Sequence, residues 1–304
     1  MANKDGRWAN FLKLINDGIS WTHDTLNFWR GCDKVSAACL HCYIYRILRR
    51  FGQTAWGTVI RTTPHTWGKA KRWEAYLADT TDGKTYMRMF TCSLSDFFHA
   101  KADKWRDEAW KVIKDSPHCV YLILTKRPER IAKHLPKDWG EGYPNVWLGV
   151  SIGDNKSVYL ADVLRKVPAA VRFLSLEPLL EDISEKLDIT GIGWIIVGGE
   201  SGESEEYRWD SATMDWRGMD GKKGRRTMDL AWAYRLYIKA CDAHVPFFFK
   251  QITSAKSGEG ADKLTGEKVH NWPAPPNGGV WWVKPEGFGA AAESELVQIK
   301  KAGK

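Results

Sequence analysis

The chain has 304 residues, with 45 Lys and Arg against 37 Asp and Glu, so its formal net charge at pH 7 is +8. This length is sufficient for a full hydrophobic core, and six cysteines in a chain with no predicted secretory signal or membrane-length apolar run argue against a disulfide framework. The positive charge suits an anionic partner, and the 17 tryptophans suit both core packing and stacking on nucleobases.

Three cysteines stand close together early in the chain. Cys32, Cys39 and Cys42 have a C-x6-C-x2-C spacing. Thiolates are the ligands that iron–sulfur clusters, zinc and copper(I) select. Three thiolates on a cubane cluster leave one iron open to another ligand, whereas structural zinc needs a fourth protein ligand, for which His23 and His41 are the nearby candidates. The spacing alone leaves cluster and zinc open and makes a disulfide the least favoured reading.

Apolar runs and helical patterns alternate after the cysteines. Helical patterns cover 44–51, 67–77, 102–114, 160–167 and 228–243, the last capped by Thr227. Six short apolar runs have the length of buried strands, and one further candidate strand precedes Cys32; the six are Met87–Cys92, Cys119–Leu124, Val146–Val150, Val171–Leu176, Trp194–Val197 and Val245–Phe249. This alternation predicts an α/β fold with right-handed β–α units and a parallel sheet, in the form of a full or partial β/α barrel.

Polar residues follow the predicted strands at the points where they end. In a β/α barrel these positions form the active-site face. The residues are Ser93, Asp96, Lys126, Arg127, Ser151, Glu177, Glu200, Lys250 and Gln251. For any one of them, the alternative explanation is that strands end at the surface, where side chains are polar, or, for those that could contact a cofactor, that the residue forms a buried salt bridge in the barrel mouth. Six strand ends in succession with charged or hydroxyl side chains favour a site.

The pattern divides the chain into a barrel and its additions. Residues 1–20 form an amino-terminal extension and residues 21–253 the barrel. The charged, Gly-rich segment 202–226 breaks the alternation and is either a solvated loop or a substrate lid with phosphate contacts. The tail, 254–304, is rich in Pro and Gly; we expect Trp281–Trp282 to dock on the barrel and the last dozen residues to be frayed.

With these motifs in place, the chain resembles the phage Gp37/Gp68-type proteins, a family with a three-cysteine motif that is similar to the radical S-adenosylmethionine superfamily. The cysteine spacing is longer than the C-x3-C-x2-C usual in that superfamily, and a Leu-Asp-Gly-like signature is degenerate at Leu264-Thr-Gly266. In the cysteine region the matching residues are Gly31–Cys32, Val35–Ser36, Cys39 and Cys42–Tyr43. The other matching segments are Ser93–His99, Leu124–Pro128, Val146–Ser151, Phe173–Leu180, Val197–Gly202 and Phe247–Gln251.

The resemblance implies a specific chemistry. Cys32, Cys39 and Cys42 would hold a [4Fe-4S] cluster whose open iron binds the amine and carboxylate of S-adenosylmethionine. One electron, from an external donor such as flavodoxin or ferredoxin, would cleave the sulfonium and release a 5′-deoxyadenosyl radical that abstracts hydrogen from substrate. Whether the outcome is an isomerisation, a lyase reaction or a transfer stays open. A cytoplasmic location is expected, in the host if a phage encodes the chain.

The resemblance also suggests roles for seven residues around S-adenosylmethionine. Ser93 and Asp96 are our choice for its amine. Its carboxylate, or a substrate phosphate, would contact Lys126 and Arg127. The remaining three are Ser151 and Glu177 for the ribose hydroxyls and Glu200 on a Gly-Gly turn. The other cysteines, Cys92, Cys119 and Cys241, are expected to be plain buried thiols.

Three functional hypotheses follow. The first is a radical S-adenosylmethionine enzyme acting on a nucleotide or DNA base, as in phage thymine hypermodification or photoproduct-type repair. Its anionic substrate would enter over Lys126, Arg127 and the basic segment Lys222–Arg226. The second is a zinc-stabilised nucleic-acid-binding protein. The third is a cluster-bearing redox partner that makes no radical.

Overall fold

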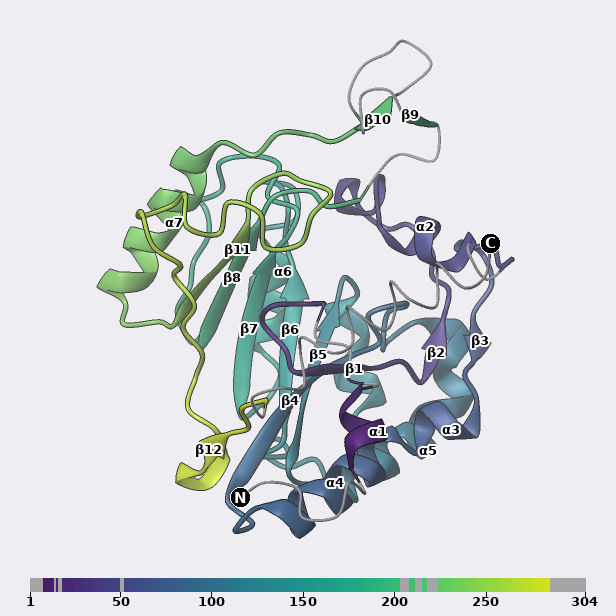
Figure 1. Cartoon of the computed structure of the whole chain (residues 1–304). Helices are drawn as coiled ribbons and strands as arrows, with labels where there is room; N and C mark the ends of the chain where they lie inside the picture. The colour runs from purple at the N-terminus through teal and green to yellow at the C-terminus, as the bar shows by residue number, and fades with distance from the viewer. Residues whose placement is uncertain are drawn as a thin grey trace.

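A parallel sheet curled into a half-barrel forms the centre of the molecule (Figure 1). The structure is a computed structural model, and it describes residues 8–13, 15, 18–49, 52–202, 208–210, 215–217 and 224–284. Seven strands lie side by side in chain order: β1 (Asp24–Leu26), β4 (Thr85–Thr91), β5 (Cys119–Thr125), β6 (Val146–Ser151), β7 (Val171–Leu176), β8 (Trp194–Gly198) and β11 (Phe247–Gln251).

Every neighbouring pair in this series is parallel. The six predicted strands and the candidate strand before Cys32 are therefore confirmed, with shifts of two residues or fewer at most ends. Chain order and spatial order agree because each strand returns beside the preceding one through a crossover connection. The predicted α/β architecture is thus confirmed in the form of a half-barrel.

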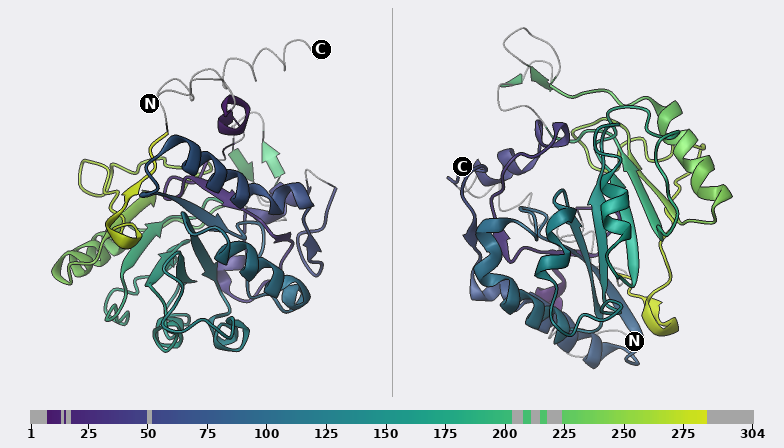
Figure 2. Two further views of the ribbon diagram at one scale, coloured as in Figure 1. Left: turned by 90° about the horizontal axis from the view of Figure 1, so that it is seen from below. Right: turned by 180° about the vertical axis from the view of Figure 1, so that it is seen from behind.

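Helices cover the outer, convex face of the sheet (Figure 2). The main ones are α4 (Lys69–Thr80), α5 (Asp103–Lys114), α6 (Leu160–Arg165) and α7 (Leu230–Asp242). The predicted cap of α7 is wrong: Asp229, not Thr227, accepts a hydrogen bond from the backbone N–H of Ala231. A carboxylate at this position is also favoured by the helix dipole.

One connection, from β7 to β8, contains no α-helix, and apolar residues of its loop, such as Ile183 and Leu187, cover the sheet instead.

Short helices complete the described part of the chain. The remaining helical segments are α1 (Ala9–Lys13), η1 (Ala37–Cys39), α2 (Ile44–Arg49), α3 (Pro64–Trp67), η2 (Ala100–Ala102), η3 (Pro128–Arg130), η4 (Ala132–His134) and η5 (Pro276–Gly278).

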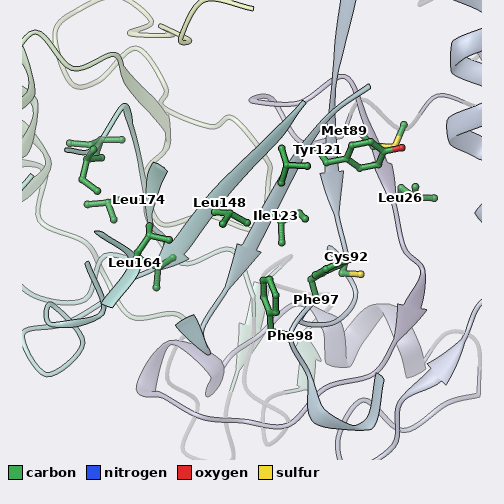
Figure 3. Packing of buried hydrophobic residues seen from close by; sticks show 14 of the residues in the cluster. Leu26, Met89, Cys92, Phe97, Phe98, Tyr121, Ile123, Leu148, Leu164 and Leu174 are labelled. Atoms are coloured by element: carbon green, nitrogen blue, oxygen red, sulfur yellow. The ribbon is translucent and has the colours of Figure 1, made fainter. Parts of the chain in front are cut away.

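The two faces of the sheet are both apolar but differ in content. Alternate residues of β4 divide between them: Met87 and Met89 face the helices, whereas Tyr86 and Phe90 face the interior. Figure 3 shows part of the outer cluster, which is mostly aliphatic around Ile123. The inner cluster is largely aromatic, and the buried rings of Trp21, Phe90, Trp147, Phe173, Trp194 and Phe248 belong to it. Burial of such a side chain contributes roughly 1.5–3 kcal/mol.

A carboxyl-terminal stretch runs from the edge strand β11 to the first residues of β4, which β1 leaves unpaired. We call residues 269–282 the closing segment. At one end Phe249 N donates to Val269 O of this segment at 2.8 Å, and at the other Trp282 N donates to Tyr86 O at 2.7 Å. Its strand β12 (Val280–Trp281) pairs in parallel with β4, as Figure 1 shows. The predicted docking of Trp281–Trp282 is therefore confirmed, whereas the predicted frayed end lies outside the described residues.

Two small antiparallel sheets of two strands each lie outside the main sheet. Strands β2 (Trp29–Arg30) and β3 (Ile60–Arg61) are antiparallel, as are β9 (Arg208–Asp210) and β10 (Asp215–Arg217). The segment predicted as a loop without regular structure, 202–226, thus contains a hairpin in its described residues, whereas Lys222 and Lys223 lie outside them. None of the helices in the described ranges is long and apolar enough to cross a membrane.

Candidate functional site

The cysteines lie on a segment that crosses the carboxyl ends of the strands. We call residues 32–43 the cysteine loop. At the end of β4, Tyr43 Oη donates to Ser93 O at 2.6 Å, and at the end of β8, His41 Nδ1 lies 2.8 Å from Glu200 Oε2. In Figure 1, α2, which follows this loop, lies at the same end of the half-barrel as the β9–β10 hairpin. The loop therefore covers the end of the sheet where strand-end residues gather.

A cavity of about 570 Å³ lies between the cysteine loop and the strand ends. Its floor includes Trp21, Phe90 and Leu124 of the inner aromatic cluster. This volume falls within the range of ligand sites in proteins. The ten residues predicted for the site all line it: Cys32, Cys39, Cys42, Ser93, Asp96, Lys126, Arg127, Ser151, Glu177 and Glu200.

The three thiols share the cavity but have different surroundings. Burial and the nearby Asp96 raise the pKa of Cys32 to about 12, against the opposing effect of Arg127. Burial likewise raises the pKa of Cys42, against Lys126. For Cys39, burial opposes ionisation, but Lys126 and hydrogen bonds outweigh it and lower the pKa. Cations next to thiols favour the thiolate form that binds metals.

The thiols are not gathered around one point. Cys39 Sγ lies 3.6 Å from Ser36 Oγ, while Cys32 Sγ lies 3.6 Å from Asp33 O. Across the described ranges, no three His, Cys, Asp or Glu side chains are grouped as a metal site. The chemistry of the donor set does fit a thiolate-held cluster, because Lys126 and Arg127 stand beside the thiols and offset their negative charge.

Arg127 fastens the first part of the cysteine loop to β5. Its Nη2 donates to Asp33 O at 3.1 Å, and its Nη1 lies 3.9 Å from Cys32 Sγ and 3.4 Å from Asp96 Oδ2. Despite the cost of burial, Asp96 and Cys32 raise the pKa of the guanidinium. Lys126 differs, since no hydrogen bond or ion pair joins its Nζ to the described chain. Of these two predicted cations, Lys126 is the one available to a ligand.

Asp96 is a junction between β4 and β5. Thr125 Oγ1 donates to Asp96 Oδ1 at 2.8 Å, Lys126 N donates to Oδ2 at 3.0 Å, and Phe98 N donates to Oδ1 at 2.8 Å. With Arg127 beside Oδ2 as well, both carboxylate oxygens are occupied, and the residue is only 4% exposed. Asp96 lines the cavity as predicted, but its hydrogen bonds hold the chain in place.

Glu200 fastens the second part of the cysteine loop. Besides His41, its carboxylate accepts hydrogen bonds from Arg226 N at 2.7 Å and Arg226 Nε at 3.0 Å, and from Nη2. Burial opposes ionisation of Glu200, but His41 and Arg226 outweigh it and lower its pKa. A Cβ at Gly202 would lie 1.7 Å from His41 O, so the backbone after Glu200 packs directly on the loop.

Glu177 and Lys250 form an ion pair in the cavity wall. Lys250 Nζ lies 2.9 Å from Glu177 Oε1, yet this oxygen has no partner with hydrogen-bond geometry. The other oxygen accepts from Ser175 Oγ at 3.3 Å. Ser151 Oγ donates to the backbone O of Glu177 at 3.2 Å, which positions the residue. The pair thus presents an incompletely bonded carboxylate and an ammonium side by side.

Several functional positions escape sequence reasoning. Tyr43 and His41 tether the cysteine loop, and only their adjacency to Cys42 hints at it. Asn27 holds the chain at Ser93, with Leu94 N donating to its Oδ1 at 2.7 Å. Among the other cysteines, Cys92 and Cys119 are buried as predicted, but Cys241 is exposed because it lies on the outer side of α7.

Comparison with known proteins gives a family. No curated protein and no solved structure matches the chain. The family model described as protein of unknown function (DUF5131) matches residues 16–216, more than half of the chain. The match includes the cysteine loop and strands β1 to β8. The chain therefore belongs to the DUF5131 family.

Proposed function

We propose that the chain is a radical S-adenosylmethionine enzyme that binds a [4Fe-4S] cluster through Cys32, Cys39 and Cys42. One observation carries the proposal: the three thiols line the same cavity as the strand-end residues expected around S-adenosylmethionine. Residues from distant parts of the chain meet there, at the carboxyl ends of parallel strands where α/β folds place their sites. When bound, the cluster supplies the electron that cleaves S-adenosylmethionine to a 5′-deoxyadenosyl radical.

The chain's own residues hold the cofactors and shape the cavity. Arg127, Tyr43 and Glu200 fasten the cysteine loop to three strand ends. Lys126 offsets the charge of the thiolates. The aromatic floor excludes water from one side of the cavity, which limits quenching of reactive species.

The pair Glu177–Lys250 suits the methionine end of the cofactor. An amino acid carries an ammonium and a carboxylate on one carbon, and the pair offers the complementary charges side by side. Because the carboxylates of Asp96 and Glu200 are occupied by the chain, we assign the cofactor amine to Glu177 and the carboxylate to Lys250 or Lys126. Ser93 and Ser151 donate their hydroxyl protons to Asn27 Oδ1 and to Glu177 O, so each can contact a cofactor hydroxyl as an acceptor.

We propose a nucleotide or nucleic-acid base as the substrate. Three features favour an anionic ligand: Lys126 in the cavity, whose Nζ has no partner within the described ranges, the exposed Arg49 on α2, and the net charge of +8. Phe90 in the floor offers an aromatic ring, and Leu124 an apolar side chain, to a base. A base within a duplex would have to be extruded to enter, at a cost of a few kcal/mol, so single strands and free nucleotides should react faster than duplex DNA.

The experiment is a measurement of 5′-deoxyadenosine release by the anaerobically reconstituted, reduced protein. We expect release with S-adenosylmethionine alone and an increase on addition of a nucleotide or single-stranded DNA. A steep loss of the increase with salt would identify a polymer held through phosphates, and a flat response a mononucleotide. If only a peptide or a sugar raises release, the substrate assignment is wrong. No release under any condition contradicts the radical chemistry.

Cysteine variants supply the matched control. Cys32→Ala, Cys39→Ala and Cys42→Ala should each abolish iron binding and 5′-deoxyadenosine release. Cys241→Ala removes an exposed thiol on α7, far from the cavity lining, and should leave both unchanged. Equal loss of iron in Cys241→Ala would show that the ligand set is wrong.

A further inference from the structure

A buried arginine lies inside the half-barrel, outside the cavity lining. Arg88 is in the middle of β4, is 5% exposed, and faces the interior between the inward-facing residues Tyr86 and Phe90. Phe90 lies in the cavity floor, so Arg88 sits one inward position further toward the amino ends of the strands. Neither the cysteines nor the proposed cofactor contacts involve it.

The guanidinium lies over the rings of two tryptophans of the closing segment. Its central carbon lies 4.5 Å from the ring centre of Trp272 and 4.9 Å from that of Trp281. Such stacking stabilises a cation through the ring faces. This stacking does not satisfy the N–H groups of the guanidinium, which lie in its plane, point outward and need hydrogen-bond acceptors.

The neighbouring side chain with an acceptor nitrogen is His23, and its acceptor already binds the backbone of Arg88. His23 Nδ1 accepts the backbone N–H of Arg88 at 2.8 Å, while His23 Nε2 lies 2.9 Å from Arg88 Nη2. Burial and Arg88 lower the pKa of His23 to about 2, so the ring is neutral and has only one acceptor nitrogen. With Nδ1 accepting, Nε2 carries the proton. Two N–H groups, one from each residue, therefore face the same place.

The positive charge is also without a counter-charge in the described chain. No carboxylate there forms an ion pair with Arg88, and burial alone lowers its pKa to about 9, which still leaves it charged at pH 7. A buried charge without a partner costs several kcal/mol. Among the described residues its Nε has no hydrogen-bond partner, and neither does the buried indole N–H of Trp21 or of Trp272 in the same inner cluster.

We propose that the interior of the half-barrel binds a small inorganic anion at Arg88. The anion accepts hydrogen bonds from the guanidinium and from His23 Nε2, and it supplies the counter-charge that the interior lacks. Buried N–H groups in proteins are almost always paired, and a bound ion or water is the usual partner where the chain offers none. Because Trp272 and Trp281 cover the guanidinium, the anion also stabilises the closing segment on β4.

The test is the anion dependence of unfolding of the full chain. Stability is measured with sodium chloride and with sodium phosphate, each against sodium gluconate at equal ionic strength. At an anion concentration of a hundred times Kd, binding raises the folding equilibrium constant about a hundredfold. A response to either chloride or phosphate supports the site and identifies which anion it prefers. A response equal to that of gluconate overturns it.

Two variants make the test specific. Arg88→Met keeps the length of the side chain without its charge, and the anion response should disappear. Arg106→Met is the matched control, because Arg106 is equally buried but donates to Phe97 O, Asp103 Oδ1 and His99 O. It should lose stability yet keep the anion response. Retention of the response in Arg88→Met overturns the proposal.

A direct measurement covers the case in which Arg88→Met does not fold. The line width of the chloride NMR signal is recorded with the folded wild-type chain and compared with the chain unfolded in denaturant. Broadening that phosphate reverses supports the site, since competing anions displace chloride. Absence of broadening by the folded chain, together with no phosphate effect on stability, overturns it.

Discussion

Glu200 and Glu74 each lie 2.8 Å from the Nδ1 of a histidine, but at opposite ends of the sheet. Glu200 follows β8 and holds His41 of the cysteine loop, together with Arg226. Glu74, on α4, holds His118 at the start of β5 and accepts two backbone N–H groups there, from His118 at 2.8 Å and Cys119 at 3.1 Å. The same pair of side chains thus fastens a helix at one end and a loop at the other.

The difference lies in what each pair restrains. Glu74 joins two regular elements that also share a large apolar contact, so its loss removes one link among many. The cysteine loop has only a short 3-10 turn, η1, of its own and depends on side-chain links to the strand ends. We conclude that polar links at the amino ends contribute stability, whereas those at the carboxyl ends set the geometry of the thiols.

The largest expected effect is that of Glu200→Gln. An amide cannot satisfy His41 and Arg226 as the carboxylate does, and breaking a buried network of this kind costs about 3 kcal/mol. We expect impaired iron incorporation and faster reaction of Cys39 and Cys42 with a thiol reagent in the metal-free protein. Thiol kinetics and iron content are the measurements.

Glu74→Gln is the control for that variant. It should lower the free energy of unfolding by about 1–2 kcal/mol and leave thiol kinetics and iron content unchanged. Equal thiol kinetics in Glu200→Gln and Glu74→Gln would break the distinction between the two ends.

The next largest effect is expected when a glycine that flanks β8 is replaced by alanine. In Gly202→Ala the new Cβ would lie 1.7 Å from the backbone O of His41, which must move. In Gly193→Ala, before the amino end of the strand, it meets the side chain of Val171 at 3.1 Å. We expect Gly202→Ala to lower the free energy of unfolding by about 1–3 kcal/mol and to displace the thiols, which changes their reaction rates with a thiol reagent. Gly193→Ala should lower the free energy of unfolding by less and leave the thiol reaction rates normal. The reverse order would contradict the close packing of the loop.

Asp96→Asn sharpens the comparison at a third position. The change places an amide where Thr125, Lys126 N and Arg127 all donate, and the unsatisfied donors cost about 1–3 kcal/mol. Because Arg127 is then less restrained, Cys32 should react faster with a thiol reagent. Asp24→Asn is the matched control: its carboxylate accepts from Trp73 Nε1 at 2.9 Å, outside the cavity. A normal Cys32 rate in Asp96→Asn would show that Arg127 is held without it.

The smallest effects are those of pH, and they separate the two regions. The folded pKa of His23 is lowered to about 2, so the unfolded chain binds more protons, and stability is lost as pH falls below about 6.5 by up to about 1.4 kcal/mol per unit. The pKa of Glu200 is also lowered, so its contribution is present above its unfolded value of about 4.3 and is lost only below it.

Difference curves against variants measure the two contributions. His23→Gln should flatten the loss from about pH 6.5 downwards, through the upper window above pH 4.3 and on toward the folded pKa of about 2, whereas Glu200→Gln should change the curve only below about pH 4.3. Other groups share both windows, so the difference from wild type is the relevant quantity. A change in the upper window for Glu200→Gln would contradict the assigned cause.

Much of the fold could be predicted because its signals are local. Runs such as Cys119–Leu124 are apolar throughout, which only a strand covered on both faces requires. The ten predicted site residues do meet in one cavity, since strand ends in a parallel sheet gather by geometry. The closing segment could not be predicted beyond its tryptophans, because its pairing with β4 joins Val280 to Thr85, 195 positions away in the sequence.

The roles within the site could not be predicted because they depend on partners. Asp96 and Glu200 carry the same charge past a strand end as Glu177, yet the first two are occupied by donors from other segments. Arg226, which donates hydrogen bonds to the Glu200 carboxylate, lies at the end of a segment with no periodic pattern. Only three-dimensional contacts separate a carboxylate that holds the chain from one that faces the cavity.

The central claim is that the cysteine loop binds an iron–sulfur cluster, and the most direct measurement is the iron and sulfide content of protein reconstituted without oxygen. We expect about four irons and four sulfides per chain, with broad absorbance near 400 nm, and loss of both in Cys39→Ala. Stoichiometric zinc without sulfide, in protein purified and kept anaerobically, would contradict the claim.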